Sequence, residues 1–229
     1  MANLGLFYSY KETRLDLEPT TQGSTVSIRL PPPGASTWPS KTAQKRSHIT
    51  EIPVAEDESS FRQRHLATAA SIYYRTHHKS PRSFLWRILE DGKVLVIRVV
   101  DVSSQVNAAD ANLSLRLSFP SRIIPACVAF SDSKEHDLLS AFVLTETNHL
   151  YTLTLRPDYF RKPSSTEDNV VDWCKSSLSS GVSVKKAFRL VALSTDELLL
   201  STTDGGLLRL SRISGGDGTW NIWHSEFDT

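Results

Sequence analysis

Two histidines and one glycine-rich run are the parts of the sequence that most resemble known ligand-binding motifs. His77 and His78 stand beside Lys79, but the sequence has no HExxH arrangement and no carboxylate close to the pair. A solvated loop is therefore favoured over a metal site. Residues 215–218 read Gly-Gly-Asp-Gly, and no Gly-Lys-Ser/Thr follows them. A flexible turn is therefore favoured over a phosphate-binding loop.

The sequence gives no support for nucleophilic catalysis either. The sequence has no GxSxG motif before a helical segment, so a hydrolase nucleophile is not indicated. Cys127 lies in an apolar run and is expected to be a small core residue. Cys127 and Cys174 are far apart and form no CxxC pair, which argues against a disulfide scaffold and a zinc finger. We therefore expect no enzyme, no catalytic, cofactor-binding or metal residue, no cofactor and no small-molecule substrate.

Two short motifs are too weak to assign a function. Residues 41–46 hold three basic side chains in a polar stretch, which could serve nuclear import or nucleic-acid binding but is short and interrupted. Aromatic residues are not interleaved with basic ones in a way that suggests base stacking, so no specific nucleic-acid partner is expected. Residues 112–114 match a glycosylation acceptor, which has no meaning without a secretory signal.

Residues 173–188 pair bulky apolar side chains with a polar Ser/Gly-rich side. Segments of this kind can insert shallowly into curved membranes by burying their apolar side. The candidate membrane-contact residues are Trp173, Leu178, Val182 and Phe188. The alternative is a helix and loop packed on the protein's own surface, which is favoured because the periodicity weakens after Leu178.

Composition limits the protein class without indicating a task. The 229 residues are 39% hydrophobic, and 26 basic and 25 acidic residues give a formal charge of +1. A core can form, and no net field recruits nucleic acid or an anionic membrane. The N-terminus lacks the features of a signal peptide, and no apolar run approaches the roughly 20 residues that span a bilayer. The sequence predicts a soluble intracellular protein.

Three β-hairpins carry the strongest structural signal. The strand pairs are residues 84–89 with 94–100, 138–145 with 150–155, and 198–203 with 207–212. Asp91-Gly92 supplies the positive φ angles that a tight primed turn requires. Val94 and Val96 should point to one side of their strand, and Leu95 and Ile97 to the other, so this strand must be covered on both faces.

The hairpins recur at a nearly constant period. Their turn centres Gly92, Asn148 and Gly205 are spaced 56 and 57 residues apart. A feeder strand precedes each hairpin, at residues 70–74, 126–130 and 189–193. This repeat is typical of a propeller, in which neighbouring sheets pack face to face. A plain antiparallel meander is the alternative.

The remaining segments connect or decorate these units. Residues 8–30 predict one or two short strands, and residues 31–57 predict a flexible, proline-interrupted loop. Residues 58–70 contain helix formers. Residues 158–186 predict a helical insertion in which 164–168 cap a short helix. Its apolar stripe would comprise Val170, Val171, Trp173, Cys174 and Leu178.

Four stretches resemble a known family. They are YKETRL (10–15), FRQRHLATAASIYYR (61–75), SPRSFLWRILEDG (80–92) and IPACVAF (124–130). In this order they are similar to the N-terminal region of the fungal 120/160-kilodalton scaffold nucleoporins, which belong to the Y-shaped subcomplex of the nuclear pore. The similarity extends from about Tyr10 to Phe227 and depends on this extent, since its motifs are structural.

The resemblance implies a mainly β chain, with three to four blades of a seven-bladed propeller and one or two short helical insertions. Residues 1–229 would then be an incomplete N-terminal propeller domain that lacks the family's C-terminal helical domain. Since ring closure hides strand edges, we expect exposed edges and poor solubility. A monodisperse, cooperatively melting monomer would contradict that expectation.

The function that the resemblance implies is structural. The chain would contact other nucleoporins of the Y-shaped subcomplex, and curved membrane weakly. It would support nucleocytoplasmic transport of protein and mRNA at the nuclear pore, in the nuclear envelope of the nucleus. The alternatives are a propeller adaptor of a membrane-coat or trafficking complex and a propeller-based enzyme. The enzyme is disfavoured because acid, base and metal clusters are missing.

Overall fold

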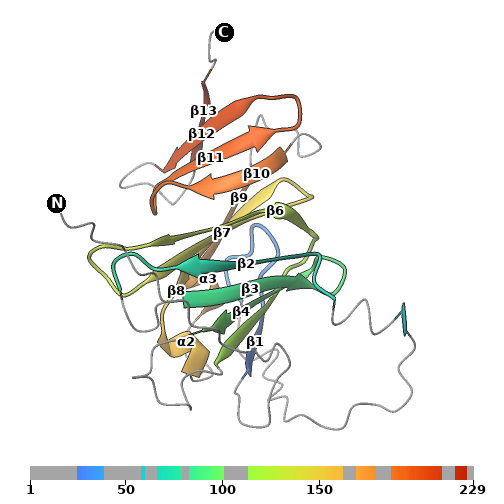
Figure 1. Cartoon of the computed structure of the whole chain (residues 1–229), viewed down its shortest axis with the longest axis vertical. Coiled ribbons are helices and arrows are strands. Elements are labelled where there is room, and N and C mark those ends of the chain that lie inside the picture. Colours follow the sequence, from blue (N-terminus) through green and yellow to red (C-terminus); the bar gives the residue numbers. More distant parts are fainter. Residues whose placement is uncertain are drawn as a thin grey trace, which may run out of the picture.

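The chain folds into three β-sheets that lie side by side (Figure 1). The computed structural model describes residues 25–38, 58–59, 66–78, 83–100, 113–161, 169–178, 187–212 and 220–225. The first sheet has five strands, which in spatial order are β1 (Thr25–Arg29), β5 (Ser114–Ser118), β4 (Val94–Val99), β3 (Ser83–Leu89) and β2 (Ala69–Tyr74). All neighbours in it pair antiparallel except β1 and β5, which run parallel.

The second and third sheets each have four strands in simple sequence order. The second comprises β6 (Ile123–Asp132), β7 (Leu139–Thr145), β8 (His149–Leu155) and β9 (Cys174–Leu178). The third comprises β10 (Ala187–Ala192), β11 (Glu197–Thr202), β12 (Leu207–Arg212) and β13 (Trp220–Ser225). Two one-turn helices, α2 (Asp158–Arg161) and α3 (Val170–Trp173), connect β8 to β9. The sheets form part of a ring and leave it open, so the predicted partial propeller is confirmed.

The turn centres of the three predicted hairpins all have left-handed backbone conformations. The φ angle is +83° at Gly92, +70° at Asn148 and +88° at Gly205. Asp91 also has a positive φ, of 53°, as the tight turn between β3 and β4 requires. The predicted repeat of 56 and 57 residues therefore places one left-handed residue in each hairpin turn, and the first turn has two more, Glu90 and Asp91.

Substituting Gly92 with alanine should lower the free energy of unfolding by about 1–2 kcal/mol, because a Cβ strains left-handed backbone by about that much. Space does not cause the loss, since the nearest atom to that Cβ would be the Ile123 carbonyl oxygen at 3.7 Å. Gly92→Asn should cost less, because asparagine tolerates this region. Urea denaturation of both variants measures the difference, and equal losses would contradict the conformational explanation.

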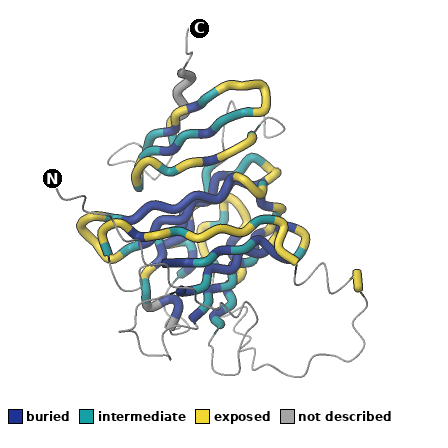
Figure 2. Tube along the Cα trace, in the orientation of Figure 1, coloured by how far each residue is buried: buried dark blue, intermediate teal, exposed yellow. Residues whose placement is uncertain are grey.

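The second sheet lies between the other two and is covered on both faces. Leu139, Ala141 and Val143 of β7 face the first sheet, whereas Phe142 and Leu144 face the third. All seven residues of β7 are buried, and the tube of Figure 2 is dark blue along this strand. Face-to-face packing of neighbouring sheets is what allows a strand to be apolar on both sides.

The first sheet confirms the predicted division of β4 into two faces. Leu95 and Ile97 belong to the hydrophobic core between the first and second sheets. Side chains from β8 and from both short helices complete this core. Val94 and Val96 instead form a separate small cluster with Leu89 on the other face. That other face belongs to no sheet–sheet contact within the described residues.

Sequence patterns missed the last strand of every sheet. β5, β9 and β13 each pair with the outer strand of a predicted hairpin. Only β5 carries a usable signal, the alternation of buried Leu113, Leu115, Leu117 and Phe119. β9 reads Cys-Lys-Ser-Ser-Leu, which has no period-2 pattern, so its pairing with β8 decides its conformation.

The predicted helical insertion is partly wrong. Its helix has one turn, and Asn169 caps it by accepting a hydrogen bond from the Val171 N–H at 3.3 Å. From Cys174 onward the expected apolar stripe is instead the strand β9, because the free edge of β8 offers backbone partners there. Residues 162–168, which include the expected cap, lie outside the described residues, as do residues 8–24, 39–57 and 60–65.

Candidate protein-interaction surface

The first and second sheets are joined at one end by a buried charge network. Arg75 follows β2 and lies 2.8 Å, Nε to Oδ1, from Asp132 at the end of β6. Both side chains are only 1% exposed. A second carboxylate, that of Asp137, lies 2.7 Å from Arg75 Nη2 and is half exposed. An ion pair removed from water in this way is geometrically specific, because neither charge has an alternative partner in solvent.

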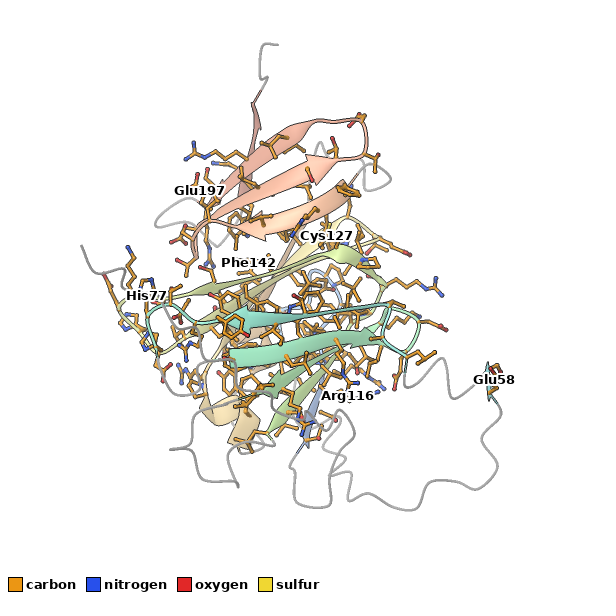
Figure 3. All side chains as sticks on the ribbon, in the orientation of Figure 1. Glu58, His77, Arg116, Cys127, Phe142 and Glu197 are labelled. Atoms are coloured by element: carbon orange, nitrogen blue, oxygen red, sulfur yellow. The ribbon has the colours of Figure 1, made fainter. Side chains whose placement is uncertain are left out.

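The same aspartate organises the histidine pair. Asp132 Oδ2 accepts hydrogen bonds from the backbone N–H groups of His77, at 2.9 Å, and His78, at 3.3 Å. The His78 ring lies 2.8 Å, Nε2 to O, from the Ser133 carbonyl. Figure 3 labels His77 beside the end of β2. His77 and His78 thus lie in a loop in which His77 is exposed, as expected, and a buried carboxylate from another sheet holds the backbone of that loop.

No described cluster resembles a metal centre. Within the ranges given above, no three His, Cys, Asp or Glu side chains gather closely enough to hold a metal ion. The described helices also include none with the length and apolar character needed to cross a bilayer. The basic stretch 41–46 and the glycine-rich run 215–218 lie outside the described residues.

Hydrogen bonds of Trp38, which follows β1, also join the first and second sheets. The N–H of Trp38 donates to Asn169 Oδ1 at 2.9 Å, and the Val170 N–H donates to the Trp38 carbonyl at 3.3 Å. The indole Nε1–H of Trp38 donates to the Arg29 carbonyl at 2.8 Å. The segment after β1 is thus tied to the helix α3. Within the expected loop 31–57, Trp38 therefore has defined partners.

An aromatic contact joins the second and third sheets. Phe142 of β7 and Trp220 of β13 meet edge to face, with ring centroids 5.6 Å apart. The indole Nε1–H of Trp220 donates to Thr152 Oγ1 at 3.0 Å. Phe142 is fully buried, and Figure 3 places it between the two sheets. This contact and the charge network hold the three sheets as one stack.

The two cysteines are buried and free, as expected for core residues. Burial raises the pKa of Cys127 and of Cys174 to about 12 from the ordinary 9.0. Since the thiolate is the reactive form, both should resist a thiol reagent at pH 8 until the chain unfolds. Labelling with and without denaturant tests this, and rapid labelling of the folded chain would contradict it.

The same shifts predict a loss of stability in alkali. Below pH 9 the thiol keeps its proton in both the folded and the unfolded state, so its ionisation does not lower the free energy of unfolding there. Above pH 9 the unfolded chain ionises first, so this contribution is lost as pH rises through about 12. Titration of the urea midpoint from pH 8 to 11 measures it, with the Cys127→Ala variant as the control.

The structure does not bring the predicted membrane-contact residues onto one surface. Trp173 is buried against Tyr159, with ring centroids 5.3 Å apart. Leu178 ends β9 and pairs in register with His149. Phe188 on β10 is 58% exposed, and Val182 lies outside the described residues. Membrane contact stays a prediction, which flotation of the 173–188 peptide with small vesicles tests.

Comparisons with known proteins identify the architecture. Residues 82–227 match the family model described as "Nucleoporin Nup120/160, beta-propeller domain". Over 217 residues, which are 93% of this chain, the sequence is 42% identical to Nucleoporin NUP120 of Chaetomium thermophilum. Over 160 residues, 69% of the chain, it is 27% identical to Nucleoporin nup120 of Schizosaccharomyces pombe. The chain spans 17% and 14% of these two proteins. The resemblance predicted from the sequence is confirmed.

Proposed function

The chain belongs to the Nup120/160 β-propeller family, and on that premise we propose that it is a structural element of the nuclear pore scaffold. It contacts other nucleoporins of the Y-shaped subcomplex at the nuclear envelope, and in this way it supports transport of protein and mRNA. Similarity to a nucleoporin over 93% of the chain is the observation that carries the proposal.

The mechanism that we propose is geometric. Three sheets held by a buried charge network and an aromatic contact form a rigid body. Rigid loops bind partners with little loss of conformational entropy, because ordering them on binding is not required. The chain itself does no covalent chemistry in this proposal, and its buried thiols remain protonated and unreactive.

Affinity purification of the tagged chain from its own cells tests the proposal. We expect nucleoporins in the purified material and a fluorescent rim at the nuclear envelope. Vesicle-coat subunits in place of nucleoporins would overturn it in favour of a trafficking adaptor. Turnover of a substrate that is lost on substitution of polar residues on β2, β6 and β10, the first strand of each sheet, would overturn it in favour of an enzyme.

A matched variant shows whether the folded stack makes the contacts. Phe142→Ala should loosen the third sheet from the second while leaving every loop sequence unchanged. We expect it to recover fewer nucleoporins than the unchanged chain at equal expression. Leu66→Ala, which removes a side chain that is 54% exposed, serves as the control and should recover them normally.

A further inference from the structure

Four arginines lie in a diagonal row on the face of the first sheet that points away from the second sheet. They are Arg87 on β3, Arg98 on β4, Arg116 on β5 and Arg29 on β1, and we call them the arginine row. Figure 3 labels Arg116 at the end of the molecule opposite the third sheet. Each of these four strands is the neighbour of the next in the sheet, so the row crosses most of its width.

The strand register places each member of the row diagonally beside the next. Arg87 and Arg116 both pair with Val96 of β4, and Arg98 follows Val96 by two positions. On the far side of β5, Arg29 lies two positions beyond the residue of β1 that pairs with Arg116. Diagonal neighbours on adjacent strands are about 7–8 Å apart at the backbone, so the four side chains share one surface.

This surface carries an excess of positive charge. The strands of the first sheet, all of which the structure describes, contain no aspartate or glutamate. Glu90, in the turn between β3 and β4, forms an ion pair with Arg116. Partial removal from water lowers the pKa of Arg87 and of Arg116. Their positive charge is therefore held at a cost that an opposing carboxylate would offset.

The opposite face of the same strands has no charge. There every side chain of β3, β4 and β5 belongs to the hydrophobic core that packs on the second sheet. The face of these strands that packs against another sheet is therefore apolar, whereas the face with the arginine row offers charge to whatever covers it. Val94 and Val96, which lie on the row's side of β4, are already buried.

We propose that the arginine row binds an acidic segment of another protein. A guanidinium group can donate two parallel hydrogen bonds to one carboxylate, which gives such a contact both strength and direction. An extended segment presents alternate side chains on one side about 6–7 Å apart. This spacing fits the distance between neighbouring members of the row, so successive carboxylates can each meet a guanidinium group.

The composition of this face favours a protein over a nucleic acid or an anionic membrane. All the cations on the strands of the first sheet are arginines, and none is lysine. Protein interfaces are enriched in arginine and depleted in lysine. Leu85 pairs with Arg98 on one side and with Ile72 of β2 on the other. Because Ile72 is 38% exposed, apolar side chains of a bound protein also find a contact beside the row.

Fluorescence anisotropy with the full 229-residue chain tests the proposal. The probe is a labelled peptide that alternates glutamate with serine. We expect it to bind, and to bind less tightly as salt is added. The same peptide with glutamine in place of glutamate should not bind. Arg98→Glu should weaken binding roughly tenfold, because it replaces an attraction by a repulsion at the middle of the row. Arg29 is exposed, so Arg29→Glu provides the same test without disturbing a half-buried position.

Arg209→Glu is the matched control, because it reverses a charge that is 59% exposed on β12 of the third sheet. It should bind the glutamate peptide as the unchanged chain does. Absence of binding, equal weakening by Arg209→Glu, or tighter binding of a single-stranded oligonucleotide or of phosphatidylserine vesicles would each overturn the proposal. The inference rests on the proposed function only in expecting a protein partner. It fails if the peptide does not bind, whereas the proposed function fails if nucleoporins are not recovered, so the two failures can be told apart.

Discussion

Asp132→Ala should destabilise the chain by about 3 kcal/mol, because it removes the buried partner of the Arg75 guanidinium at 2.8 Å and leaves only the half-exposed carboxylate of Asp137. The substitution also removes the acceptor of the His77 and His78 backbone N–H groups. Loss of these part-buried hydrogen bonds adds to the destabilisation. Urea denaturation followed by circular dichroism measures the change in free energy of unfolding.

Two further variants distinguish the effect of breaking the buried ion pair on stability from the effect of removing a carboxylate as such. Asp196→Ala removes a carboxylate that is 64% exposed and lies 4.0 Å from Arg212, so its loss should be below about 1 kcal/mol. The double variant Arg75→Met with Asp132→Leu should recover only the part of the loss that comes from the uncompensated charge, because the His77 and His78 N–H groups still lack the carboxylate as acceptor. If Asp132→Ala costs no more than Asp196→Ala, the network does not stabilise the junction of the two sheets.

Phe142→Ala should lower the free energy of unfolding by about 3–5 kcal/mol, since it removes a fully buried ring and leaves a cavity. The loss should concentrate at the boundary between the second and third sheets, because the ring contacts Trp220 there. Native-state hydrogen exchange reports this directly. Amides of β11 should lose more protection than amides of β3 and β4.

The control for this prediction is Leu66→Ala, whose side chain is 54% exposed. Its effect should lie within about 0.5 kcal/mol, as is usual for exposed positions. Uniform loss of protection across all three sheets in Phe142→Ala would show that the stack unfolds as one cooperative unit. In that case the aromatic contact would stabilise the whole chain and not one boundary.

The membership of the chain in a nucleoporin family gives these stability predictions a functional consequence. A scaffold element acts by holding its loops in fixed positions, so substitutions that loosen the stack should reduce partner recovery without touching any loop. Asp132 and Phe142 lie at different boundaries. Comparing the nucleoporins lost from each variant would therefore show which boundary supports which contact.

Local patterns determined the hairpins, their turns and the division of each strand into two faces. Gly92, Asn148 and Gly205 could be located from the sequence, because positive φ angles favour a few residue types and so leave a local signal. The burial of Cys127 is also a local prediction, because the residues around it in β6 are apolar on both sides of the strand. The family resemblance is likewise carried by local sequence, in residues 61–75, 80–92 and 124–130 among others.

Tertiary structure alone decided the strand β9 and the contacts between sheets. β9 has no strand pattern of its own and forms because β8 presents a free edge. Arg75 and Asp132 are 57 positions apart, and no local pattern indicates that a charge will be buried beside its partner. Hydrophobic periodicity reports which face of a strand leaves water. It cannot report which neighbour covers that face, because this depends on how whole sheets pack.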